Sequence, residues 1–444
     1  MNAFPPGATA TLRTTWRWLR EPIAFFDDCK RRYGDTFSMR IAGLPPIVVF
    51  SDPDAVKQIF ADDGHTLEAG KFNLSLRAFL GERSVLMLDG DEHMRQRKLL
   101  LPPFHGERML TYGRAMMDLA DAAIDGWPLL SGSGRQSFAL HPSMQTITLQ
   151  IILRTVFGID EAAAMAPVER NIAALLDIAA WAPLLLPPLQ RDFGAWSPWA
   201  KFQKEAGELD RTLRDLIDRR RREGTAGRTD VLSLLVSARD EEGAPLTDDE
   251  LRDELVTLLV AGHETTATSL AWALRWILAR PKVEARLMEE LAPVANQPDR
   301  VAKLEYLDAV VRETLRLQPV VPIVGRVLAR EVSIGDYTLP KGSAVVASIY
   351  LAHRREAAFP DAEEFRPERF LERKPSPNEW YPFGGGNRRC IGMAFALYEM
   401  KMVLARILTR TTLRLDPREH IKVVRRAITL TPSGGVRVFM HARS

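Results

Sequence analysis

A cysteine that follows two arginines is the residue best suited to chemistry in this chain. It lies in the segment FGGGNRRCIG, Phe383 to Gly392, and the chain has one other cysteine, Cys29. Positive neighbours and the start of a helix lower the pKa of a thiol and favour the thiolate. A thiolate can attack a substrate or bind a metal, but the sequence identifies no histidine base to support attack. Ligation of a metal cofactor by Cys390 alone is therefore the better prediction.

Two other interpretations of the same segment are less well supported. A nucleotide-binding loop would need a strand before the glycines, and either the Lys-Ser/Thr of a phosphate loop or the spacing GxGxxG, and none of these is present. A buried cysteine that only fills space would not need Asn387, Arg388 and Arg389 directly before it.

A polar cluster, Gly262 to Thr266, interrupts the apolar run LLVAGHETTATSLAW. Gly262 weakens a helix by about 1 kcal/mol relative to alanine, and a neighbouring threonine can donate a hydrogen bond to the carbonyl four residues earlier. The cluster is either a kinked core helix or a groove where a small ligand approaches the backbone beside a hydroxyl and a carboxylate. The residues alone leave both interpretations open.

A pair of opposite charges, Glu313 and Arg316, lies at i and i+3 in VRETLRLQP. Most such pairs are exposed and contribute little to stability. The segment FRPERF supplies Arg369 in a loop that proline constrains, so a carboxylate held between two guanidinium groups is the alternative.

The elements that must position these residues are mainly helical. Apolar periodicity predicts helices over 113–126, 143–157, 201–223, 247–280, 282–293, 304–317 and 391–409. Short strands are predicted near 47–51, within 332–348 and near the C-terminus. The fold class is therefore mainly α with small β-sheets, and the lack of a linker predicts a single domain over residues 1–444.

Composition and charge further limit the classes of function that the sequence supports. Apolar residues make up 46% and charged residues 26% of the 444 residues, and the formal net charge is +3 with the basic residues spread along the chain. This pattern gives no support to nucleic-acid binding. Two cysteines are too few for a disulfide framework or a four-ligand zinc site, and this suits a reducing compartment.

No apolar run is long enough for a secretory signal or a membrane-spanning helix. We therefore expect a cytoplasmic protein without a transmembrane anchor. The segment WAPLLLPPL, residues 181–189, is predicted to be an apolar loop because its prolines would break a helix, and it is a candidate for contact with lipid or with hydrophobic substrate.

Together these motifs resemble the cytochrome P-450 superfamily over essentially the whole chain. FGGGNRRCIG is similar to the haem-ligand loop FxxGxRxCxG, ETLR at 313–316 to the ExxR pair, and AGHETT at 261–266 to the oxygen-binding helix. The resemblance implies the cytochrome P-450 fold, with a long central helix over a haem, and haem b (iron protoporphyrin IX) as cofactor.

The resemblance also implies roles for individual residues. Cys390 would be the axial thiolate ligand, Phe383 would shield its sulfur, and the loop glycines, through Gly392, would let the loop press on the haem. Glu264 and Thr265 would be the acid and alcohol that supply protons for oxygen cleavage, beside Ala261 and Gly262. Glu313, Arg316 and Arg369 would form a structural charge triad. The residues that match propionate-binding positions are His93, Arg97, Arg326 and Arg388.

The implied activity is monooxygenation of a sizeable hydrophobic substrate such as a fatty acid, terpenoid or polyketide, and bacterial members near fatty-acid hydroxylases are the most similar. Substrate contacts are expected from 70–88, 178–193, Leu258, Ala261 and 320–324. Electrons would come from a separate ferredoxin or flavodoxin with its reductase, and we expect a monomer. The cations predicted to receive that partner are Arg95, Lys98, Arg389 and Lys401.

Two alternatives belong to other classes. A peroxide-dependent haem peroxygenase would normally lack the pair Glu264 and Thr265, and a non-catalytic haem-binding protein would not need it.

Overall fold

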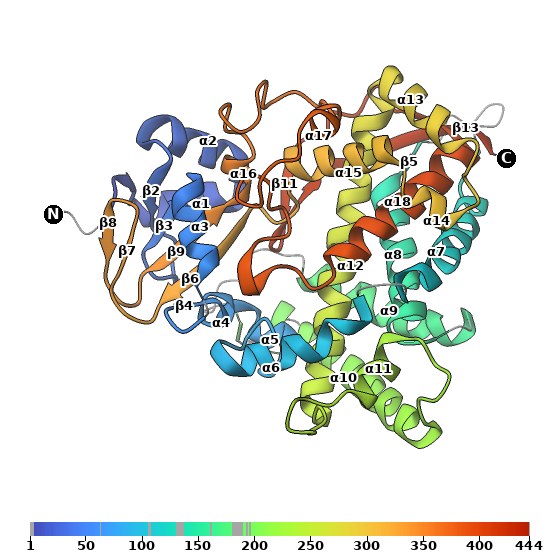
Figure 1. Ribbon diagram of the computed structural model, residues 1–444, viewed down its shortest axis with the longest axis horizontal. Coiled ribbons are helices and arrows are strands. Elements are labelled where there is room, and N and C mark those ends of the chain that lie inside the picture. Colours follow the sequence, from blue (N-terminus) through green and yellow to red (C-terminus); the bar gives the residue numbers. More distant parts are fainter. Residues whose placement is uncertain are drawn as a thin grey trace.

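Helices make up most of the molecule, as the sequence predicts (Figure 1). The computed structural model describes residues 4–62, 64–104, 108–129, 137–159, 162–179, 190–191, 194 and 197–443. Its α-helices are α1 Thr11–Arg20, α2 Pro22–Tyr33, α3 Pro53–Ala61, α4 Ala69–Phe72, α5 Arg77–Leu80, α6 Gly90–Leu100, α7 Arg108–Asp125, α8 Leu140–Thr155, α9 Ala162–Ala179, α10 Pro198–Glu223, α11 Val231–Ser237, α12 Asp248–Leu278, α13 Pro281–Leu291, α14 Pro298–Val301, α15 Glu305–Leu317, α16 Ile349–Ala352, α17 Arg369–Glu372 and α18 Met393–Arg410.

The strands form one larger sheet and three small ones. They are β1 Gly7–Ala8, β2 Thr36–Met39, β3 Ile47–Phe50, β4 Leu67–Glu68, β5 Phe138–Ala139, β6 Ile323–Leu328, β7 Val332–Ile334, β8 Tyr337–Leu339, β9 Ala344–Ser348, β10 Thr411–Leu415, β11 Val423–Arg426, β12 Thr429–Pro432 and β13 Arg437–Arg443. The six-stranded sheet has the order β1-β2-β3-β9-β6-β4 and lies on the left of Figure 1. The others are β10-β13-β5, β11-β12 and β7-β8.

The centre of the larger sheet is buried on both faces. All four residues of β3 are buried, and the strand pairs in parallel with β9. Val48 and Phe50 belong to one apolar cluster, whereas Ile47 and Val49 belong to the other. Successive side chains of a strand point to opposite faces, so an uninterrupted apolar run is what a strand buried on both faces requires.

Helix α12 crosses the middle of the molecule and packs beside α8, α15 and α18 (Figure 1). Its start was predictable from a capping box. The Thr247 hydroxyl accepts from the Glu250 N–H at 3.2 Å, and the Glu250 carboxylate accepts from the Thr247 N–H at 2.8 Å. With 31 residues the helix is about 46 Å long and spans the helical part of the protein.

The predicted helices are confirmed, with shifts at their ends. The helix predicted from residue 201 begins at Pro198, because Ser197 caps it through the Ala200 N–H. The short helices α4 and α5, the N-terminal helices and strand β6 were not predicted. The apolar loop predicted over 181–189 lies outside the described residues. Within the described part of the chain, no helix is long and apolar enough to cross a membrane.

Candidate functional site

A cavity of about 450 Å³ is lined by the cysteine loop, residues 383–392, and by α12. Its volume lies in the range of small-molecule sites. Its wall is mainly apolar and includes residues from three of the four regions expected to contact substrate, among them Leu76, Phe79, Leu258, Ala261, Val320 and Val324. Most of the fourth region, 178–193, lies outside the described residues.

The cysteine loop folds back on itself beneath this cavity. The Cys390 N–H donates to the Phe383 carbonyl at 2.9 Å, and Gly384 and Gly386 have φ values of 69° and 61° that favour glycine. A Cβ on Gly386 would lie 1.8 Å from the carbonyl oxygen of Phe60 in α3. Gly386 therefore permits close approach of the loop to α3, and approach of the loop glycines to the cofactor stays a prediction.

Gly392 differs from the glycines that precede it. A Cβ added to Gly392 would meet no atom within 4 Å, and Gly392 belongs to the wall of the cavity. The space above it is therefore available to a bound group.

The Cys390 thiol is exposed to the cavity, yet burial by the surrounding protein raises its pKa. The Gly392 N–H and the charges of Arg97 and Arg389 act in the opposite direction, but they do not overcome the loss of solvation. The prediction that the surroundings lower this pKa is wrong in its net direction. Ligation of a metal by this sulfur would displace its proton, so Cys390 would be a thiolate when a metal cofactor is bound.

Cys29 provides a comparison within the same chain. It is 3% exposed in an apolar cluster, and burial raises its pKa to about 11. Cys29 packs in that apolar cluster and does not line the cavity beside Cys390, so it acts as a small hydrophobic side chain.

On α12, the Thr265 hydroxyl donates to the Ala261 carbonyl at 2.6 Å, and both residues line the cavity. The bond that a kinked core helix would have is thus present, but the threonine also faces open space. The two interpretations of this segment are compatible. Gly262 also touches the cavity, although a Cβ there would lie 3.1 Å from the Ile152 side chain of α8, so Gly262 additionally permits close packing of the two helices.

The carboxylate of Glu264 is held by groups that the sequence did not reveal. One oxygen accepts from Gln145 Nε2 at 2.7 Å. The other lies 3.5 Å from Arg426 Nε and 3.7 Å from His141 Nε2. Burial, followed by the charge of Arg426, lowers the pKa of His141 to about 4, so its imidazole is neutral near pH 7.

Four basic groups form what we call the open cluster: His93, Arg97, Arg326 and Arg388. Arg388 donates to Asp89 Oδ1 at 2.6 Å, which is the one ion pair of these four groups among the described residues. Arg326 is 6% exposed, and burial and then Arg388 lower its pKa to about 10. His93, Arg97 and Arg388 line the cavity, whereas Arg326 is not one of its lining residues.

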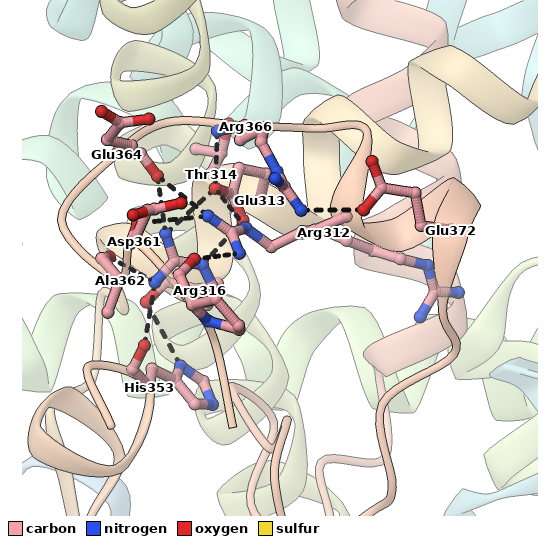
Figure 2. A network of polar contacts seen from close by, with 12 residues as sticks. Arg312, Glu313, Thr314, Arg316, His353, Asp361, Ala362, Glu364, Arg366 and Glu372 are labelled. Atoms are coloured by element: carbon pink, nitrogen blue, oxygen red, sulfur yellow. Dashed lines mark hydrogen bonds and ion pairs between the residues drawn. The ribbon is translucent and has the colours of Figure 1, made fainter. Parts of the chain in front are cut away.

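The residues Glu313, Arg316 and Arg369 form what we call the closed cluster. Glu313 accepts from Arg316 Nε at 2.7 Å and from Arg369 Nε at 3.1 Å, and Glu313 and Arg316 are fully buried. Figure 2 shows Arg316 enclosed by Glu313 and by the backbone carbonyls that include those of His353 and Ala362. The alternative of a carboxylate between two guanidinium groups is therefore the observed one.

A family model for cytochrome P450 matches residues 5–437. The chain belongs to the cytochrome P450 family. Cytochrome P450 135B1 of Mycobacterium tuberculosis is 40% identical over 428 residues, which cover 96% of this chain and 88% of that protein. Cytochrome P450 138 of Mycobacterium bovis is 34% identical over 420 residues, covering 93% and 90%. The predicted family and the oxidoreductase class, a P450 monooxygenase, are confirmed.

The fold is confirmed by a solved structure. Retinoic acid-bound cyanobacterial CYP120A1 matches this cytochrome P450 with a TM-score of 0.86 and 24% identity, covering 99% of this chain and 100% of that one. The cytochrome P-450 fold with small sheets and a long central helix is therefore the architecture of this protein.

Haem b is the cofactor of the family, and the residues present fit it. Cys390 presents a thiol to the cavity beside the unfilled space at Gly392. The open cluster has one carboxylate for four basic groups, so it suits a ligand that brings negative charge, as the two propionates of haem would. Cys390 would hold the iron, and His93, Arg97, Arg326 and Arg388 would hold the propionates.

Some residues at the site had no recognisable signal in the sequence. The tip of the β11–β12 hairpin, Arg426 to Thr429, lines the cavity, and Gln145 reaches Glu264 from α8. An arginine in a strand and a glutamine in a helix look like ordinary surface residues until packing brings them to the site.

Three of the four cations predicted to receive a redox partner are already paired. Arg95 lies 2.6 Å from Asp240, Lys98 lies 2.7 Å from Glu241, and Lys401 lies 3.1 Å from Asp308. Among the described residues, only Arg389 of this set is exposed without an ion pair. The predicted accumulation of free positive charge is therefore reduced to Arg389.

Proposed function

We propose that this cytochrome P450 oxygenates a sizeable hydrophobic molecule such as a fatty acid, a terpenoid or a polyketide. The observation that carries the proposal is the apolar wall of the cavity beside Cys390 and Thr265. Phe79, Leu258 and Val320 belong to that wall. A wall of this kind buries the apolar surface of a ligand and offers few polar groups to bind it.

In this proposal each polar residue of the site has a defined task. Haem b, bound through Cys390, supplies the oxygen-activating chemistry. The Thr265 hydroxyl donates its hydrogen bond to the Ala261 carbonyl, so its oxygen can accept a hydrogen bond from a group in the cavity. Glu264, held by Gln145 and Arg426, is the adjoining group that can exchange a proton with it.

The electron source in this proposal is a separate ferredoxin or flavodoxin with its reductase, and the enzyme works as a monomer of one domain. Arg389 lies beside Cys390 in the sequence and is exposed, so it can contact an acidic partner. Reduction by such a partner should slow as salt is raised, and Arg389→Gln should weaken that salt dependence.

A comparison of the two cysteines tests the haem-thiolate site. Cys390→Ser should abolish the thiolate-type absorption of the reduced carbon-monoxide complex, because oxygen replaces the ligating sulfur. Cys29→Ser is the matched control and should retain that absorption. Identical spectra for wild type and Cys390→Ser would contradict the assignment.

A ligand panel tests the substrate class. Hydrophobic candidates should shift the haem spin state in an optical titration, and those that do should yield oxygenated products with surrogate ferredoxin and reductase. Binding of only small polar ligands would overturn the substrate class, and turnover by peroxide in preference to reduced ferredoxin would favour a peroxygenase.

A further inference from the structure

Helix α1 exposes two large apolar side chains on one face. Leu12 is 83% exposed and Trp16 is 56% exposed, and they lie at i and i+4. Single exposed hydrophobic residues are common on protein surfaces, so this pair is informative only together with its surroundings. The opposite side of the helix, which includes Thr14 and Trp18, is buried against the rest of the chain.

The surroundings of this pair are basic. Arg13 and Arg20 are exposed and fall within the same 100° sector of the helix as Leu12 and Trp16, taking about 100° per residue. Neither arginine has an ion pair among the residues that the structure describes, and α1 contains no acidic residue. Arg17, outside that sector, is paired with Asp28 at 2.6 Å.

We propose that α1 docks this protein reversibly on an anionic lipid surface. Leu12 and Trp16 enter the interfacial layer, and Arg13 and Arg20 contact lipid phosphates, which is how a basic amphipathic helix lies in a membrane interface. Two apolar side chains are too small an area for a stable interface between proteins, which needs roughly 800 Å² on each partner. Lipid requires no such area, because it conforms to the side chains.

Contacts of α1 connect this surface to the cavity. The Arg425 guanidinium of β11 lies 4.2 Å from the ring centroid of Trp18 and donates to the Trp18 carbonyl at 3.2 Å. The tip of the same hairpin, Arg426 to Thr429, lines the cavity. Docking would therefore hold the substrate site close to the bilayer, where hydrophobic molecules concentrate. The advantage of a substrate site close to the bilayer rests on the proposed substrate class, whereas the proposal that α1 docks on lipid does not.

Sedimentation of the full-length, haem-loaded protein with vesicles tests the proposal. Wild type should bind phosphatidylglycerol vesicles and bind phosphatidylcholine vesicles at least tenfold more weakly, because two arginines lose their anionic partners. Transfer of Trp16 to the interface should also shift the tryptophan fluorescence to shorter wavelength. Failure to find a substrate leaves these measurements unaffected.

Two double variants separate the contributions. Leu12→Ser with Trp16→Ser should weaken binding at least tenfold on both lipids. Arg13→Gln with Arg20→Gln should weaken binding to phosphatidylglycerol by roughly 25-fold, at about fivefold per arginine, and leave phosphatidylcholine binding little changed. Leu371→Ser is the matched control, because Leu371 is 41% exposed on α17, and it should bind as wild type does.

Three results would overturn the proposal. They are absence of wild-type binding to phosphatidylglycerol, retention of binding by both double variants, and an equal loss in Leu371→Ser. Concentration-dependent self-association that Leu12→Ser with Trp16→Ser removes would instead assign this face to a second copy of the chain. Unchanged haem spectra and thermal midpoints establish that the variants are folded.

Discussion

The open and closed clusters both gather basic side chains inside the protein, but they differ in what neutralises them. All five N–H groups of Arg316 in the closed cluster have partners, two from Glu313 and three from backbone carbonyls. In the open cluster, Asp89 is the one carboxylate that the described residues place in an ion pair with the four basic groups.

This difference distinguishes charged residues that the folded chain itself neutralises from charged residues that a bound ligand would have to neutralise. A buried ion pair with every donor satisfied is costly to break, because removal of one partner leaves the other charge buried alone. A cluster that the chain leaves incomplete destabilises the protein until something else brings negative charge. The same residue type, arginine, therefore has opposite effects on the stability of the free protein at the two places.

The largest expected effect is at the closed cluster. Glu313→Gln removes the charge that Arg316 and Arg369 share, so it should lower the free energy of unfolding by about 3 to 5 kcal/mol. Chemical denaturation and the yield of folded protein measure the change. A loss below about 1 kcal/mol would show that the backbone carbonyls alone satisfy the two arginines.

Arg97→Met should act in the opposite way at the open cluster. Burial already lowers the pKa of Arg97, so removal of its charge should leave the haem-free protein as stable or more stable. Loss of a charge-assisted hydrogen bond to a propionate should weaken haem binding by about 1.5 to 3 kcal/mol, roughly 10- to 150-fold.

Transfer of haem to an excess of an acceptor globin measures the binding change, and denaturation of the haem-free protein measures stability. If Arg97→Met destabilised the haem-free protein as strongly as Glu313→Gln, the distinction between the two clusters would fail.

Lowering the pH should reduce the stability of the folded protein through His93 of the open cluster. Burial, then Arg388, Arg97 and Arg326, lower the pKa of His93 to about 3, whereas the unfolded chain has a pKa of about 6.5. Below pH 6.5 the unfolded state takes up a proton that the folded state does not, so stability is complete above that pH and is lost as the pH falls towards 3.

His93→Leu should therefore reduce the loss of stability between pH 8 and pH 5 in the haem-free protein. The full shift corresponds to about 2 kcal/mol at pH 5, and solvent screening in the adjoining cavity reduces this to on the order of 1 kcal/mol. Urea denaturation of wild type and variant at the two pH values makes the measurement. An equal loss in both proteins would assign the acid sensitivity to other buried histidines.

Removal of an exposed ion pair should have the smallest effect on stability, and it provides the baseline for the other variants. Lys98 and Glu241 lie 2.7 Å apart with side chains that are 58% and 74% exposed. Lys98→Met should leave the unfolding midpoint unchanged within error, because solvent and salt screen the pair. A change as large as that in Glu313→Gln would show that distance alone, and not burial, determines the contribution of a pair.

Much of the site was predictable because its signals are local. The capping box at Thr247 and Glu250 set the start of α12, and the spacing around Cys390 and in ETLR indicated the family. Unpredicted helices such as α4 and α5 are too short to show apolar periodicity. Strand β6 was also missed, because VVPIVGRV carries a proline and a glycine that weaken a strand pattern.

The order of the residues established which chemical groups the protein has and which of them share a helix or a loop. Which charges are neutralised was decided only by packing. Arg388 reaches Asp89 across 299 positions of the chain, and Glu264 is held by Gln145 from 119 positions away. The pKa of Cys390 rises although its neighbours in sequence are basic. The cost of removing a group from water depends on everything that surrounds it in space, and only the folded chain specifies those surroundings.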